Sequence, residues 1–172
     1  MQGTNSDTDA AVIPAPDTID FSVLAGRIKQ WGLELGFSGI GITRADAAEA
    51  TPGLLRWLAL GRHGEMDYMA KHSALRASPE ALVPGTLSII SARLPYWQPA
   101  TESERVLTDD RLAYVSRYAL GRDYHKTIRE RLQKLSDRIG KAVWAMDPEY
   151  DFRSRAFSDS APVLEVEFAR QS

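Results

Sequence analysis

The sequence predicts an α+β fold, an α/β-like sandwich in which a mixed central sheet is flanked by helices. Three observations support this class. Two long segments carry apolar residues at helical spacing, shorter segments are rich in residues typical of strands, and the two kinds of segment are interleaved along the chain. The 172 residues, 44% of them hydrophobic, suffice for one sizeable core, so a single domain is expected. The order of the strands stays open.

The first helix is expected at the start of this domain. Residues 1–17 are polar, contain alanine and proline and show no period, so a disordered tail is predicted before a domain at residues 18–172. Asp20 is the predicted N-cap of a helix that Gly36 ends. The helix has one apolar face, formed by Phe21, Leu24, Ile28, Trp31 and Leu35.

A short strand is expected at residues 37–43, with Ile40 and Ile42 on one side. Its glycines, Gly39 and Gly41, resemble the start of a dinucleotide-binding loop. That interpretation is rejected, because the third glycine is missing and no helix cap follows at the required place.

Two helices are expected next. The first covers residues 46–60 and has Pro52 in or near its first turn, and the second covers residues 65–72. The second carries Met66 and Met69, whose spacing suits either core packing or an adaptable wall against a large, flat cofactor.

The histidines near this segment do not predict a metal site. His63 and His72 lie nine residues apart, and no third ligand is near them in the sequence.

The most apolar strand is predicted at residues 86–96, and it leads into a loop with two aromatic residues, Tyr96 and Trp97. Residues 99–111 are polar and charged and predict a surface excursion. Residues 112–116 predict a strand or an extended approach to the segment that follows.

The richest chemistry of the chain lies at residues 117–126. Asp123 is the predicted N-cap of a long amphipathic helix, which places Tyr124 and His125 in its first turn. A loop that delivers polar groups to a helix N-terminus is a common way to build a site. On the residues alone, Asp123 is equally well explained as a cap, and His125 as a surface or packing histidine.

The C-terminal segment contains two further predicted elements. Residues 151–157 alternate in character and predict a strand with arginines on one face. Asp159 and Ser160 precede Pro162 and predict the cap of a final helix.

Composition excludes several classes of protein. The net charge is −2 and the pI about 5.9, which argues against a protein that coats nucleic acid. Residues 105–141 nevertheless contain ten Arg or Lys against five Asp or Glu. This local excess fits either a phosphate-binding surface or the ordinary charged face of a helix.

The chain contains no cysteine, which excludes disulfides, cysteine nucleophiles and cysteinyl iron–sulfur ligation within it. No apolar run reaches the length of a membrane span, and no secretory signal is visible, so a cytoplasmic location without membrane contact is expected.

Four segments carry a resemblance to a known family. They are Gly61-Arg-His-Gly-Glu-Met-Asp-Tyr-Met69, Leu82-Val-Pro-Gly-Thr-Leu-Ser-Ile-Ile90, Arg117-Tyr-Ala-Leu-Gly-Arg-Asp-Tyr-His-Lys126 and Phe157-Ser-Asp-Ser-Ala-Pro-Val-Leu-Glu165. In this order they resemble the epoxyqueuosine reductases, which use cobalamin and iron–sulfur clusters to complete queuosine in tRNA. The resemblance spans roughly residues 18–165.

The resemblance implies roles for individual residues. It makes Asp123 the proton donor to the epoxide oxygen and Met66 part of the wall beside the corrinoid. Helix N-termini lower a carboxyl pKa, whereas a general acid needs a raised one, so this role requires burial under the corrin ring. The expected cofactor-binding residues are Met66, Tyr96, Arg117, Tyr118, Asp123, Tyr124, His125, Asp159 and Ser160, and no metal ligand is expected.

The resemblance covers only part of such an enzyme. In the family, a following ferredoxin-like region holds two 4Fe-4S clusters, and this chain is expected to be truncated before that region. The expectation is an N-terminal cobalamin-binding domain that is inactive alone and monomeric, and that acts on tRNA only in the full-length enzyme. The alternative is a stand-alone corrinoid- or tRNA-binding module without catalysis.

Overall fold

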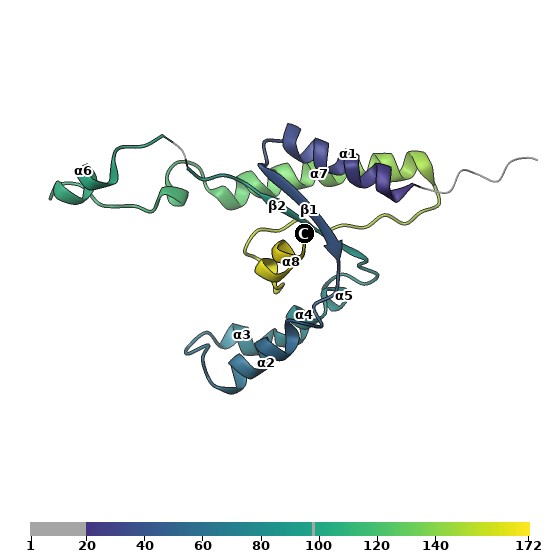
Figure 1. Cartoon of the computed structure of the whole chain (residues 1–172), viewed down its shortest axis with the longest axis horizontal. Coiled ribbons are helices and arrows are strands. Elements are labelled where there is room, and N and C mark those ends of the chain that lie inside the picture. The colour runs from purple at the N-terminus through teal and green to yellow at the C-terminus, as the bar shows by residue number, and fades with distance from the viewer. Residues whose placement is uncertain (1–19, 98) are drawn as a thin grey trace, which may run out of the picture.

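A computed structural model describes residues 20–97 and 99–172, and the tail predicted at residues 1–17 lies outside these ranges. The structure confirms the α+β class and shows a chain dominated by helices (Figure 1). The helices are α1 Phe21–Glu34, α2 Thr51–Ala59, α3 Asp67–Lys71, α4 Ser73–Ala77, α5 Pro79–Leu82, α6 Ser103–Thr108, α7 Tyr124–Met146 and α8 Glu165–Gln171, with a 3-10 turn, η1, at Arg117–Ala119.

The sheet consists of two antiparallel strands, β1 Gly39–Arg44 and β2 Ser88–Arg93, in the part of the chain that is described. Their register pairs Gly39 with Arg93 and Arg44 with Ser88. Strand β2 lies inside the strand predicted at residues 86–96, and β1 overlaps the strand predicted at residues 37–43 and ends one residue beyond it. The observed sheet is smaller than the mixed sheet expected, because two other predicted strands do not form.

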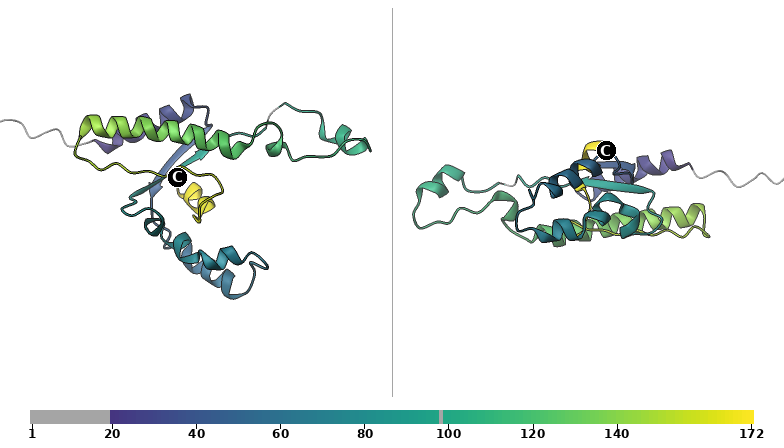
Figure 2. Two further views of the ribbon diagram at one scale, coloured as in Figure 1. Left: turned by 180° about the vertical axis from the view of Figure 1, so that it is seen from behind. Right: turned by 90° about the horizontal axis from the view of Figure 1, so that it is seen from below.

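The core forms where α1 and α7 lie side by side (Figures 1 and 2). Leu135 of α7 is only 2% exposed, and its neighbours in the core come from both helices. The strand pair closes this layer from the other side. The buried core residues are Leu24, Ile28, Leu135, Ile139 and Val143, and Ile40, Ile42 and Ile90 of the strands pack against them.

Local signals set the ends of α1 as predicted. The Asp20 side chain accepts hydrogen bonds from the backbone N–H groups of Ser22 and Val23, at 2.9 and 3.3 Å. Gly36 follows the helix with φ +84°, a conformation that favours glycine. Within the helix, a Cβ on Gly32 would stand 2.2 Å from Cγ1 of Ile40, so this glycine permits the close packing of α1 on β1.

The prediction of a strand at residues 151–157 is wrong, because this segment runs as extended chain along α7 instead. The ring of Phe152 packs against Gly140, and the Ser154 hydroxyl hydrogen-bonds the Ser136 hydroxyl. Alternation shows that every second side chain faces a surface, and here that surface is a helix.

Of the two alternatives expected at residues 112–116, a strand or an extended approach, the strand does not form. This segment belongs to a long excursion around α6 that projects away from the core (Figure 1). Without a neighbouring strand there, its extended chain has no ladder of hydrogen bonds to join.

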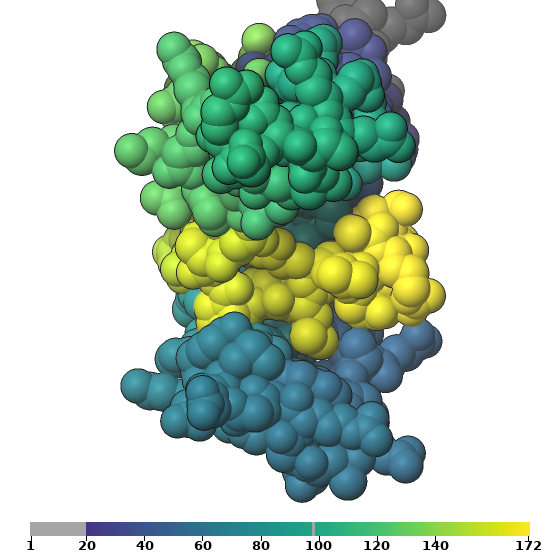
Figure 3. All heavy atoms as spheres, turned by 90° about the vertical axis from the view of Figure 1, so that its left-hand side faces the viewer, coloured from purple at the N-terminus to yellow at the C-terminus, as the bar shows by residue number. Residues whose placement is uncertain are grey.

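Two other predicted helices begin later than the sequence predicts. Helix α2 starts at Thr51 rather than at residue 46, and α8 starts at Glu165 rather than near Asp159. Phe168, which is 0% exposed, anchors α8 against the strand pair. Figure 3 shows the C-terminal segment between the α6 excursion and the α2–α4 helices.

None of the described helices has the length and apolar character that crossing a membrane requires.

Candidate functional site at the N-terminus of α7

Asp123 is the N-cap of α7, as predicted. Its Oδ1 accepts a hydrogen bond from the backbone N–H of His125 at 3.0 Å. Gly121, with φ +90°, turns the chain just before the cap. The side chain of Asp123 is 47% exposed, so its second oxygen remains accessible to a ligand.

His125 stands between two carboxylates. Its Nδ1 lies 3.0 Å from Oδ1 of Asp123, and its Nε2 lies 3.7 Å from Oδ2 of Asp159. The imidazole also stacks on the ring of Tyr124, with centroids 4.0 Å apart. These contacts on both edges and one face fix the plane of the ring.

Tyr124 joins Asp159 to the start of α7. The Tyr124 hydroxyl donates to Oδ2 of Asp159 at 2.6 Å, and this hydrogen bond is the main reason that the pKa of Tyr124 is raised to about 12. Tyr118 of η1 meets the Tyr124 ring edge-on at 5.8 Å. Two chain segments that are far apart in the sequence therefore meet at one cluster.

Asp159 reaches the cluster from an unusual backbone conformation. Its φ of +54° lies in the left-handed region, which directs the loop before α8 toward α7. The Ser160 hydroxyl, next in the chain, accepts a hydrogen bond from Arg129 of α7 at 3.4 Å. Asp159 and Ser160 were predicted to cap a helix, but Leu164 is the N-cap of α8, so this prediction is wrong.

Glu165, the first residue of α8, is a member of the cluster that the sequence prediction of site residues omits. Asp159 is the charged neighbour whose carboxylate acts on the Glu165 carboxyl. The residue keeps contact with solvent, yet burial of the carboxyl among neighbouring atoms, followed by the charge of Asp159, raises its pKa. The one signal in the sequence was its place at the end of the segment Phe157–Glu165.

The pKa of Asp123 is lowered, chiefly by the hydrogen bond from the His125 side chain. The Asp123 carboxyl of this structure is therefore ionised near neutral pH, as a helix cap usually is. A proton donor at this position needs a raised pKa, whereas the pKa of Asp123 in this structure is lowered, as the sequence leads one to expect of a helix cap.

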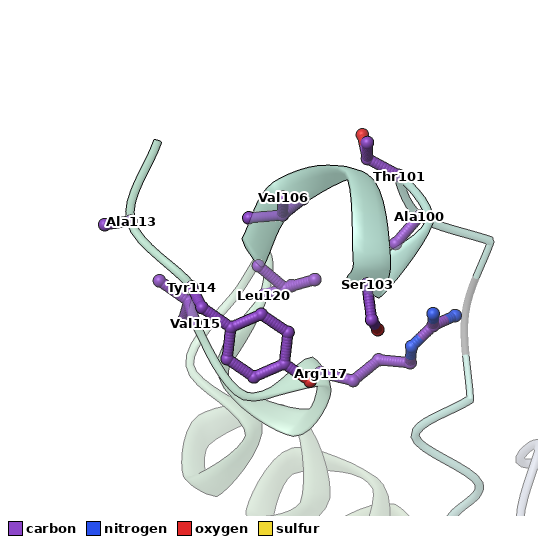
Figure 4. Close-up of a pocket in the computed structure, with 9 residues that line it drawn as sticks. All are labelled: Ala100, Thr101, Ser103, Val106, Ala113, Tyr114, Val115, Arg117 and Leu120. Carbon is purple, nitrogen blue, oxygen red and sulfur yellow. The ribbon is translucent and has the colours of Figure 1, made fainter. Parts of the chain in front are cut away.

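A shallow pocket of 320 Å³ lies beside η1, between this turn and α6 (Figure 4). Arg117 runs along its floor, and its guanidinium lies 4.0 Å from the centroid of the Trp97 ring. Tyr96, which precedes Trp97, is 62% exposed. The pocket is lined by Ala100, Thr101, Ser103, Val106, Ala113, Tyr114, Val115, Arg117 and Leu120.

Met66 lies apart from these residues. It is the N-cap of α3 and accepts a contact of 3.5 Å from the Tyr68 hydroxyl at its Sδ. Figure 1 places α3 on the other side of the strand pair from α7. A role for Met66 beside a cofactor stays a prediction. The described residues contain no group of three or more His, Asp or Glu side chains suited to a metal ion.

Fold and site define an α+β protein with an acid–base cluster at the start of its longest helix. Residues 76–160 match the family model described as "Epoxyqueuosine reductase QueG, DUF1730". An epoxyqueuosine reductase of Alicycliphilus denitrificans is 54% identical over 88% of this chain, and one of Pseudomonas aeruginosa is 52% identical over 87%. The chain belongs to the epoxyqueuosine reductase family.

The chain spans about two fifths of the length of these relatives: 42% of the Alicycliphilus protein and 40% of the Pseudomonas protein. The same holds for the epoxyqueuosine reductase of Escherichia coli, which is 47% identical over 91% of this chain and 40% of its own length. No solved structure matches the chain.

Proposed function

We propose that this chain is the N-terminal, cobalamin-binding part of an epoxyqueuosine reductase, in which Asp123 donates the proton that the epoxide oxygen needs. The observation that carries this proposal is the cluster at the start of α7. All its members except Glu165 lie within residues 76–160, the range of the family match. The proposed substrate is epoxyqueuosine in tRNA, and the proposed location is the cytoplasm, where tRNA is modified.

The residues beside the cluster fit one face of a large, flat cofactor. Tyr96, Trp97 and Tyr118 are 62, 76 and 53% exposed, and an aromatic surface with the Arg117 guanidinium suits a corrin ring with amide side chains. The pocket of 320 Å³ is too small to enclose such a ligand. We therefore expect weak binding by this chain alone, because most of the cofactor would remain uncovered.

Bound cobalamin would supply a reducing metal centre for opening the epoxide. The part of this chain is to hold and orient the substrate and to give the departing oxygen a proton from the Asp123 carboxyl. A ligand that covers Asp123 would remove water from it and raise its pKa, against the effect of His125. Because the chain has no cysteine, iron–sulfur ligands would come from outside it, and the chain alone is proposed to be inactive.

Adding hydroxocobalamin to the purified chain tests this function. We expect a change in the visible spectrum of the corrinoid that saturates with protein concentration and is weakened by Tyr118→Ala. Trp144→Ala is the matched control, because Trp144 is 65% exposed near the C-terminal end of α7. An unchanged spectrum at high protein concentration would contradict cobalamin binding.

The alternative function is a binding module without catalysis. A protein in which the chain is joined to the remaining part of a relative separates the two, because the proposed enzyme converts epoxyqueuosine in tRNA and the module does not. Filter binding of tRNA at two salt concentrations tests the nucleic-acid contact separately, since phosphate contacts weaken steeply with salt.

A further inference from the structure

His125 has a carboxylate opposite each of its two ring nitrogens. Its Nδ1 lies within hydrogen-bond distance of Oδ1 of Asp123, at 3.0 Å, and its Nε2 lies 3.7 Å from Oδ2 of Asp159. A neutral imidazole carries one N–H and can serve only one of the two carboxylates, whereas the protonated ring presents an N–H to both. The geometry therefore favours a ring that carries two protons, one toward each aspartate.

We propose that His125 is the proton source of Asp123, and that Asp159 positions the ring so that its Nδ1 proton points at the Asp123 carboxylate. His125 and Asp159 act through Asp123, so both are positioning residues in this proposal. The transfer rests on the proposed function, because it serves proton donation by Asp123. The charge and the orientation of the ring are properties of the chain itself.

The transfer moves one proton and no electrons. The Nδ1–H bond of the charged ring breaks and an O–H bond forms on Asp123, so that two charged groups become two neutral ones. Asp123 then gives the proton to the departing oxygen and becomes a carboxylate again. The His125 side chain is 45% exposed, so the ring can take up a new proton from water.

Removal of water is the physical trigger of this transfer. While the site is open, water hydrates both charges, and the hydrogen bond from His125 holds the pKa of Asp123 below its usual range. A ligand that covers the site removes this hydration, and burial disfavours a charged pair relative to a neutral one. The proton then moves to Asp123, so an ionised carboxyl in the open site agrees with a proton donor in the covered one.

Asp159 has a second contact that holds it opposite Nε2. The Tyr124 hydroxyl donates to the same Oδ2 at 2.6 Å, and the Tyr124 ring stacks on the imidazole with centroids 4.0 Å apart. Tyr118 contacts the Tyr124 ring edge-on at 5.8 Å. The negative charge of Asp159 therefore retains the proton on Nε2, which leaves Nδ1 as the nitrogen that gives up its proton.

The other charges near the ring come from three parts of the chain, and the test changes them one at a time. The titratable and charged groups that face His125 or its two carboxylates are Asp123, Tyr124 and Lys126 at the start of α7, Tyr118 of η1, and Asp159 with its neighbour Glu165.

Proton NMR of the histidine rings tests the positioning on the chain itself, without cofactor or tRNA. The chain has three histidines, so the His125 signal can be assigned by its loss in His125→Gln. Asp159→Asn removes the charge opposite Nε2 and keeps the shape of the side chain. We expect the His125 ring of this variant to lose its charge at a lower pH than in the wild type, because no carboxylate then faces Nε2.

Two variants make this result specific. Tyr124→Phe keeps the stacked ring but frees Asp159, so it should change the His125 curve in the same direction and by less. Asp137→Asn is the matched control, because Asp137 lies further along α7 and accepts a hydrogen bond from Gln133 instead. Identical His125 curves for the wild type and Asp159→Asn would overturn the positioning, and so would an equal change in Asp137→Asn.

A protein that joins the chain to the remaining part of a relative tests the transfer. His125→Gln keeps a side-chain N–H toward Asp123 but has no proton to give. We expect it to slow conversion of epoxyqueuosine in tRNA by about 100-fold, the lower end of what general acid catalysis contributes. In His125→Ala, added imidazole should restore part of the rate, which a purely structural ring would not. His72→Gln, at the end of α3, is the control and should keep the wild-type rate.

A wild-type rate in His125→Gln would overturn the proton transfer, and so would a lack of rescue of His125→Ala by imidazole. A wild-type fusion protein that converts no epoxyqueuosine would overturn the proposed function and the transfer with it. The NMR curves decide independently whether Asp159 positions His125, because they require neither cofactor nor turnover.

Discussion

At the scale of single residues, the two roles proposed for Asp123, helix cap and proton donor, require different protonation states of its carboxyl group. As a cap it must accept the N–H of His125, which an ionised or an amide side chain does equally well. As a proton donor it must hold a proton, although His125 lowers its pKa in this structure. A substitution that keeps the cap and removes the transferable proton distinguishes the two roles.

We expect Asp123→Asn to preserve the fold, because Asn caps helices about as well as Asp. In a protein that joins the chain to the rest of a relative, the same change should abolish most conversion of epoxyqueuosine in tRNA, since an amide cannot release its proton at neutral pH. Turnover and melting temperature are to be measured side by side. Equal turnover by both proteins would leave Asp123 as a cap alone.

At the scale of elements, α1 and α7 both begin at an aspartate whose side chain accepts backbone N–H groups. The hydrogen bonds of Asp20, first that from the Ser22 hydroxyl, lower its pKa. A group with a lowered pKa stabilises the fold above its unfolded pKa of 3.8, and this contribution is lost as the pH falls through the folded value.

Asp20→Ala should therefore lower the melting temperature at pH 7 by roughly 2–4 °C, because two N–H groups lose their acceptor. The difference from the wild type should shrink below pH 3.8, where the wild-type carboxyl becomes protonated. Asp20→Asn is the control and should lose little at pH 7. Thermal unfolding followed by circular dichroism measures all three, and a pH-independent loss in Asp20→Ala would refute the linkage.

At the scale of the whole molecule, stability depends on one small core between α1, α7 and the strand pair. Few side chains of residues 20–97 and 99–172 are fully buried, and one of them, Phe168, packs α8, near the C-terminus, against the strand pair. The α6 excursion leaves large apolar side chains in contact with solvent, among them Leu107 at 66% exposure. Truncating a single core side chain should therefore lower the free energy of unfolding more than truncating any exposed side chain.

Leu135→Ala should destabilise the chain by about 2–5 kcal/mol, because it leaves a cavity at a residue that is 2% exposed. Val166→Ala is the matched control, since Val166 is 85% exposed and its loss should change stability by less than about 0.5 kcal/mol. Urea unfolding measures both free energies. Comparable losses would show that the core is not where the structure places it.

The sequence alone determined the parts of the protein that depend on neighbouring residues. It predicted α1 and its cap Asp20, the start of α7 at Asp123, and strands that overlap β1 and β2. Helical period and capping are local, because each hydrogen bond joins residues a few positions apart. These signals also predicted segment 117–126 as the place of the candidate site, which stays a prediction.

Only the tertiary structure decided which surfaces those segments meet. Alternation at residues 151–157 showed an extended chain, but a period of two does not say whether its partner is a strand or, as here, α7. Asp159 reaches His125 because Phe168 anchors α8 and the loop before it turns through a positive φ. Such approaches join residues some 35 positions apart, and packing sets them rather than any local pattern.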